Sequence, residues 1–119
     1  MACEKQIDFY LPYPVLDVFA RMSREPYIGK MKVDFVDQSH YRILCSTGAN
    51  MMTWGEQVTI SFFDPQDGGT RIIAESKPKL PTTLVDWGHN QENVMNVMNH
   101  FMYLYPPQNG QAPIQPPQR

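Results

Sequence analysis

The residue best suited to chemistry in this chain is Glu56, which opens a run of alternating apolar and polar residues. A regular strand would place Glu56 on the same face as Trp54 and Val58, facing the interior. A carboxyl group in that position could act as an acid or as a polar anchor for a ligand. The alternative is a bulge at Gly55 that turns Glu56 toward water. We favour the bulge, because burying an unpaired charge is costly.

A second pair with chemical potential is His100 and Tyr103, which lie three residues apart near the end of a predicted helix. That spacing puts both on one side of the helix, where they could supply a proton donor and a proton acceptor at a cavity mouth. The apolar stripe of the same helix runs through Val97 and Phe101. We therefore expect His100 to face solvent.

The remaining reactive residue types do not form a recognisable site. His40 lies in a predicted turn and His89 near a helix start, so the three histidines lack the spacing of a metal site. Cys3 and Cys45 are isolated, which is typical of reduced cysteines in a cytoplasmic protein. No serine lies in a nucleophile elbow, and no glycine-rich phosphate loop follows a strand. We predict no catalytic residue, no metal and no cofactor.

Composition excludes several classes of partner. The chain has 119 residues and a net charge of −2, from ten lysines and arginines against twelve acidic residues. This balance argues against nucleic acid as a partner. Charges within the first five residues argue against a signal peptide, and no stretch approaches the roughly 20 apolar residues of a membrane span. We expect a cytoplasmic protein.

The elements that must position these residues end with a long helix predicted over residues 86–105. Its apolar residues recur every three or four positions, which is the period of one helix face. They are Val94, Val97, Met98, Phe101, Leu104 and Tyr105. Because almost everything upstream has the pattern of strands, we expect a sheet that curls around this helix.

The upstream segments alternate with period two, except for a short helix opened by Pro14. The predicted fold is α+β, with an antiparallel sheet of about five strands wrapped around the C-terminal helix. The order is strand, helix, four strands, helix. The expected segments are a strand at 6–11, a helix at 14–22, and strands at 31–35, 41–45, 53–63 and 70–77. Residues 1–105 are predicted to form one domain.

The last residues, 106–119, differ sharply in composition, with five prolines, four glutamines and one isoleucine. Such a segment buries too little apolar surface to offset the entropy of ordering, so we predict a disordered tail. A proline-rich ligand for an SH3-like partner is the alternative.

This order of elements resembles the helix-grip fold of the START-like, SRPBCC superfamily, which includes the birch pollen allergen, polyketide cyclases and lipid-transfer domains. The resemblance covers about residues 4–105. It is carried by residues 7–19 (IDFYLPYPVLDVF), 54–60 (WGEQVTI), 69–73 (GTRII) and 86–88 (DWG), with Asn90 and Asn93. The resemblance implies a ligand cavity between sheet and helix. Here only residues 23–30 separate the first helix from the sheet, so we expect a small enclosed space.

We therefore predict a non-enzymatic binding module that holds a small hydrophobic or amphipathic ligand between the sheet and the C-terminal helix. The expected lining residues are Phe19, Trp54, Glu56, Val58, Ile60, Ile72, Val97, Met98 and Phe101.

Two alternatives come from other classes. One is a protein-interaction or assembly domain with a solid core, forming a homodimer or binding another protein through outer aromatics such as Tyr10, Tyr41 and Phe63. The other is implied by the resemblance alone. It is a cyclase- or hydrolase-like enzyme that uses Glu56 with His100 or Tyr103.

Overall fold

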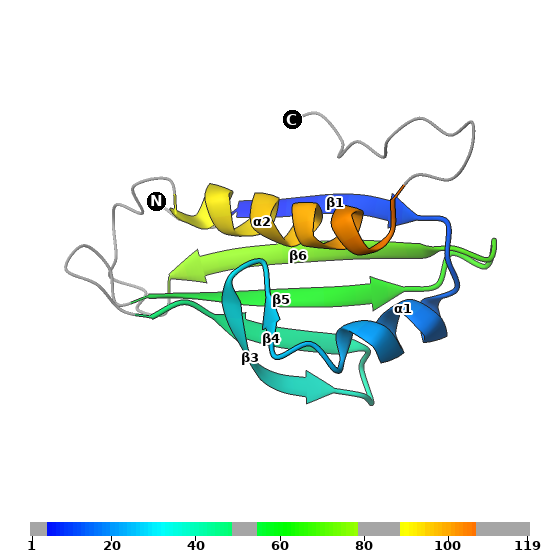
Figure 1. The fold of residues 1–119 in the computed structure, drawn as a ribbon, viewed down its shortest axis with the longest axis horizontal. Coiled ribbons are helices and arrows are strands. Elements are labelled where there is room, and N and C mark those ends of the chain that lie inside the picture. Colours follow the sequence, from blue (N-terminus) through cyan, green and yellow to red (C-terminus); the bar gives the residue numbers. More distant parts are fainter. Residues whose placement is uncertain (1–4, 49–54, 79–88, 107–119) are drawn as a thin grey trace.

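The computed structural model describes residues 5–48, 55–78 and 89–106 (Figure 1). Within these ranges the chain forms six strands and two helices. In chain order they are β1 (Lys5–Leu11), α1 (Val15–Met22), β2 (Tyr27–Ile28), β3 (Met31–Asp37), β4 (Arg42–Ser46), β5 (Glu56–Phe63), β6 (Thr70–Pro78) and α2 (His89–Leu104).

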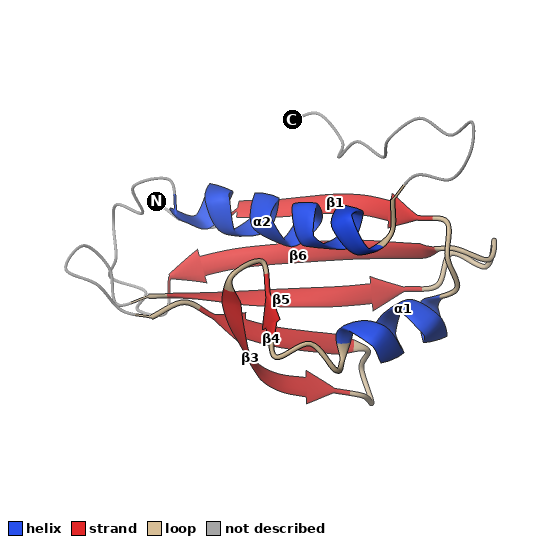
Figure 2. Ribbon diagram, viewed as in Figure 1, coloured by secondary structure: helices blue, strands red, loops and turns tan. Residues whose placement is uncertain are grey.

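All six strands belong to one curled antiparallel sheet with the order β1-β6-β5-β4-β3-β2. Both helices lie on the same face of this sheet, and α2 runs along β1, β6 and β5 (Figure 2). The predicted α+β architecture is therefore confirmed, but the sheet has one strand more than the four expected after α1. The additional strand is β2, whose two residues pair with Met31 and Lys32 and are too few to show a period.

Both helices lie where the sequence pattern predicts them. Pro14, predicted as the first helical residue, is instead the N-cap of α1, with extended dihedrals of φ −60° and ψ 142°, so the helix itself begins at Val15. The described part of α2 begins at His89. The proposed start of this helix at Asp86 lies outside the described residues, as does the predicted tail from residue 107 onward.

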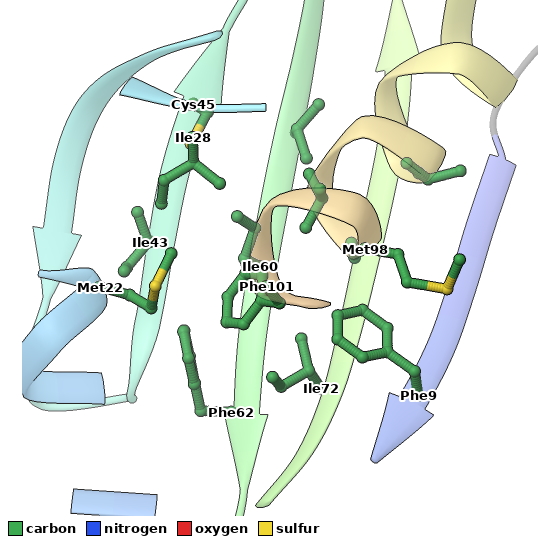
Figure 3. Packing of buried hydrophobic residues seen from close by; sticks show 14 of the residues in the cluster. Phe9, Met22, Ile28, Ile43, Cys45, Ile60, Phe62, Ile72, Met98 and Phe101 are labelled. Carbon is green, nitrogen blue, oxygen red and sulfur yellow. The ribbon is translucent and has the colours of Figure 1, made fainter. Parts of the chain in front are cut away.

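The core lies between α2 and the inner face of the sheet. Alternation along β5 and β6 directs Ile60 and Ile72 toward the helix, and Phe101 of α2 points back at them (Figure 3). The Phe101 ring meets Phe9 edge to face, with centroids 5.6 Å apart, and lies 5.9 Å from the Phe62 ring. These contacts fix the helix over the centre of the sheet.

One strand departs from simple alternation. The sequence predicts Met31, Val33 and Phe35 on one face of β3, but the register shifts between Val33 and Phe35. The irregularity turns Phe35 to the opposite side, where its side chain is 56% exposed, and Val36 packs against the core instead. The prediction for Phe35 is therefore wrong.

Within the described part of the chain, neither helix is long and apolar enough to cross a membrane.

Candidate functional site

The candidate site lies at the N-terminal end of α2, where Glu56 opens β5. Glu56 is only 3% exposed and lies on the same face as Val58, and its ladder with β6 continues without a register shift. The favoured interpretation, in which a bulge turns Glu56 toward water, is therefore wrong. Gly55 has a φ of +93°, and a Cβ there would lie 2.8 Å from the Thr47 carbonyl oxygen. This glycine lets the chain enter β5 with Glu56 directed inward.

The buried carboxylate of Glu56 is held by two neutral side chains. The Thr47 hydroxyl donates to Oε1 at 2.8 Å and accepts from the Glu56 backbone N–H at 2.9 Å. The Asn93 amide Nδ2 donates to the same carboxylate oxygen at 3.2 Å. These donors offset part of the cost of burying the carboxylate.

The hydrogen-bond network extends from Glu56 across to β6. Asn93 Nδ2 also donates to Ser76 Oγ at 3.1 Å, and the Ser76 hydroxyl donates to Asn90 Oδ1 at 2.6 Å. All four of these residues are buried. Among the described residues, every buried side-chain nitrogen or oxygen has a hydrogen-bond partner. The network is therefore a satisfied polar layer inside the fold.

His89, where the described part of α2 begins, lies next to this layer. Its Nδ1 is 3.6 Å from Glu56 Oε2, close enough for an ion pair when the imidazole is protonated. The distance is longer than a hydrogen bond.

A pocket of about 230 Å³ opens beside the carboxylate. Its walls come from the β2–β3 turn, the end of β4, the start of β5 and the first two turns of α2. The lining residues are Gly29, Lys30, Met31, Thr47, Gly48, Glu56, His89, Glu92, Asn93 and Asn96.

The β2–β3 turn packs directly on the backbone of α2. Gly29 and Lys30 both have positive φ, at 59° and 72°, as in the tight hairpin turns that match strand twist. A Cβ on Gly29 would lie 2.8 Å from the Asn96 carbonyl carbon, so glycine is required for this approach.

His100 binds the same turn. The prediction that His100 faces solvent is therefore wrong. The Gly29 N–H donates to His100 Nδ1 at 3.2 Å, and Nε2 lies 3.2 Å from Glu25 Oε1. Because Nδ1 accepts, the proton of a neutral ring is on Nε2 and is donated to Glu25. Tyr103 points away with 84% of its surface exposed. Neither residue lines the pocket around Glu56, so the catalytic combination that the resemblance offered as an alternative does not assemble there.

The predicted ligand-lining residues fall in three places. Seven of them pack together in the core cluster, and whether they contact a ligand stays a prediction. They are Phe19, Val58, Ile60, Ile72, Val97, Met98 and Phe101. Glu56 lines the pocket, and Trp54 lies outside the described residues.

The sequence interpretation missed Thr47, Ser76 and His89 as site residues, although a signal for the polar layer exists. Asn90 and Asn93 lie on the same helix face as the apolar stripe. Ser76 continues the inward alternation of β6 after Ile72 and Ala74. Polar residues at core positions on two facing elements indicate a buried polar cluster.

The described residues contain no group of three or more His, Cys, Asp or Glu side chains that could hold a metal ion. Cys45 is buried, and burial raises the pKa of its thiol to about 12, with a smaller contribution from Asp34. A thiol with that pKa is a poor nucleophile near neutral pH.

A crystal structure titled "Crystal structure of Ara h 8.0201" superposes on this chain with a TM-score of 0.52 at 13% sequence identity. The match covers 87% of this chain and 99% of that one. The chain has a birch-pollen-allergen-like helix-grip fold. A solution NMR structure of a protein from Thermobifida fusca is also similar, with a TM-score of 0.49, 9% identity, and coverage of 85% of this chain and 94% of that one. No family model matches the chain, and no curated protein matches it either.

The helix-grip fold explains where the pocket lies. The C-terminal half of α2 packs its apolar side chains on the sheet. The N-terminal turns of α2 lie beside the strand ends, where Glu56, Asn93 and the β2–β3 turn line the pocket.

Proposed function

We propose that this helix-grip protein is a non-enzymatic binding module for a small amphipathic molecule, held in the pocket at the N-terminal end of α2. The observation that carries the proposal is the buried Glu56 carboxylate, oriented by Thr47 and Asn93 at the wall of the 230 Å³ pocket. An oriented polar group in a concave site is the usual means of fixing a ligand.

The charges and hydrogen-bonding groups of the lining residues indicate which class of ligand the pocket would bind. A carboxylate is an acceptor, so Glu56 suits a ligand amine or hydroxyl, and Glu92 adds a second acidic group at the pocket. Lys30 contributes one positive charge and Met31 an apolar contact. We therefore expect a ligand that bears an amine and has a short apolar part. If the ligand is zwitterionic, its negatively charged group should lie toward Lys30.

Pocket size and core packing support a small polar-ended ligand over a large lipid. Typical ligand pockets measure about 300–1,000 Å³, and this one is slightly smaller. A lipid between sheet and helix would have to displace buried rings such as Phe101 and Phe62.

The proposal is tested with the full-length chain by titrating small primary amines and following backbone amide shifts in NMR spectra. We expect saturable shifts at Gly29, Thr47 and Asn93. Glu56→Gln preserves the side-chain shape but removes the charge, and should weaken amine binding about ten- to hundred-fold, in line with a charged hydrogen bond worth about 1.5–3 kcal/mol.

The matched control is Glu75→Gln, which neutralises a glutamate on the outer face of β6 and should leave the affinity unchanged. Shifts that instead centre on Val58, Ile72 and Phe101 would place the ligand in the core and contradict the proposed site. Absence of saturable shifts with any amine would contradict the ligand class.

A further inference from the structure

A second concavity, of about 660 Å³, lies between α1 and the turn that joins β3 to β4. One wall is a stripe of α1 that includes Leu16, Phe19 and Ala20, and the other includes Gln38 and Tyr41. We call this concavity the α1 groove. It shares no lining residue with the pocket at Glu56.

The floor of the α1 groove is aromatic. The Tyr41 ring stacks on the Phe19 ring with centroids 5.0 Å apart and an interplanar angle of 21°. Tyr41 has a φ of +53°, in the left-handed region, which is uncommon for a bulky side chain and costs about 1–3 kcal/mol. The fold holds this residue in a costly conformation that presents its ring beside α1.

The rim of the groove carries an apolar side chain that the fold leaves uncovered. Leu16 is 63% exposed on the outer flank of α1, directly beside the aromatic floor. The groove is also lined by Ser23, Arg24 and Gln38, and an exposed apolar side chain beside stacked aromatic rings with polar groups around them suits an extended peptide.

The described chain ends next to the same helix. The Tyr13 hydroxyl donates to the Pro106 carbonyl oxygen at 3.2 Å, and the Tyr13 and Tyr105 rings lie 4.9 Å apart. The Arg21 guanidinium of α1 lies 5.9 Å from the Tyr105 ring centroid. The described chain therefore ends beside α1, and 13 further residues, 107–119, follow that point in the sequence.

These last residues contain Pro113-Ile114-Gln115-Pro116, a PxxP sequence. PxxP segments favour the polyproline II conformation and dock into grooves lined with aromatic rings. Residues 107–112 precede the motif, and six residues in that conformation span about 19 Å, more than the width of α1. The motif is thus within reach of Tyr41 and Leu16.

We propose that the PxxP segment at residues 113–116 docks into the α1 groove of its own chain, against Phe19, Tyr41 and Leu16. Tethering gives the segment a millimolar effective concentration, so a contact too weak to hold a free peptide suffices. This groove is a self-recognition site separate from the ligand pocket.

Paramagnetic NMR on the full-length chain tests the docking. A nitroxide is attached at Gln118→Cys in a Cys3→Ser background, where buried Cys45 stays unlabelled. We expect the amide signals of Leu16, Ala20 and Gln38 to lose most of their intensity. The double variant Pro113→Ala/Pro116→Ala should restore these signals, and Pro107→Ala, outside the motif, should not.

The groove side is tested by Leu16→Glu, which changes an exposed residue and should restore the signals without unfolding the protein. Its matched control is Tyr103→Glu, an exposed apolar-to-acid change on α2, which should leave the broadening intact. Broadening that persists in the proline double variant would overturn the proposal. So would broadening in a mixture of isotope-labelled and nitroxide-labelled chains, because that result assigns the docking to a second copy.

Discussion

The two halves of α2 face the same sheet but with opposite chemistry. Val97 and Phe101, in the C-terminal half, pack on apolar side chains, whereas Asn90 and Asn93, in the N-terminal half, bond to Ser76 and Glu56. The inner face of the sheet changes at the same level, since β6 passes from Ala74 to Ser76. The polar site therefore continues the inward-facing positions of the core. In this part of the fold the facing positions on both α2 and β6 carry polar side chains.

The two halves of α2 should contribute differently to the free energy of unfolding. Burial of apolar side chains stabilises the fold by about 1.5–3 kcal/mol for each large residue, whereas an intramolecular hydrogen bond contributes about 0.5–1.5 kcal/mol net. We therefore expect the C-terminal half of α2 to provide most of the stability. The N-terminal half provides the polar side chains of the pocket, and substitutions there should cost less stability.

The largest effect is expected for Phe101→Ala. Phe101 is fully buried between Phe9 and Phe62, so truncation removes apolar contacts and leaves a cavity, at a cost of about 3–5 kcal/mol. Urea denaturation followed by circular dichroism measures this cost. Tyr103→Ala, an exposed aromatic truncation on the same helix, should change stability by less than about 0.5 kcal/mol. Equal losses for the two variants would show that the helix is not anchored through Phe101.

A smaller effect is expected for Asn93→Ala. The change removes the donor to Glu56 and Ser76 and leaves buried acceptors short of a partner, at a cost of about 1–3 kcal/mol. Asn99→Ala, at an exposed position of the same helix, is the control and should be nearly neutral. Thermal unfolding of both variants measures the contrast. A neutral Asn93→Ala would mean that the polar layer does not contribute to stability.

The apolar half of this comparison was predictable from the sequence and the polar half largely was not. Period two along β5 and β6 and the helical stripe around Val97 and Phe101 are local patterns, and they gave the sheet, the helix and the core. The inward position of Glu56 depends on Thr47 and on Asn93, which lies 37 residues along the chain. A charge argument applied to Glu56 alone could not include these partners.

His100 shows the same limit. Helical spacing placed it beside the apolar stripe and therefore in solvent, but its partner Gly29 lies 71 residues away in a turn that only the folded sheet brings to α2. Likewise, the register shift in β3 follows from its pairing with β4 and has no clear signal around Phe35.

Cys45 is a weakly polar residue within the apolar core. Burial raises the pKa of its thiol from 9.0 to about 12, so the folded state keeps the proton that the unfolded state releases. Stability contributed by the neutral thiol should be fully present below pH 9 and be lost as the pH rises toward 12. In a Cys3→Ser background, denaturant unfolding from pH 8 to 11 should show a steeper decline than in the matching Cys45→Ala variant. Parallel declines would contradict the burial of this thiol.

The smallest effect is expected at the exposed turn between β3 and β4. The His40 side chain, 2.9 Å from Asp37 Oδ2, lowers the pKa of the Asp37 carboxyl, with smaller contributions from the His40 backbone and Arg42. Because the folded pKa is the lower one, its stabilisation is present above the unfolded pKa near 3.8 and is lost as the pH falls through the folded value. Asp37→Asn should therefore reduce the melting temperature slightly at pH 6 and not at pH 2. Exposed ion pairs contribute little and are screened by salt, so the difference at pH 6 should shrink further in 1 M NaCl. A difference that persists at pH 2 would assign the effect to turn geometry rather than to the charge of Asp37.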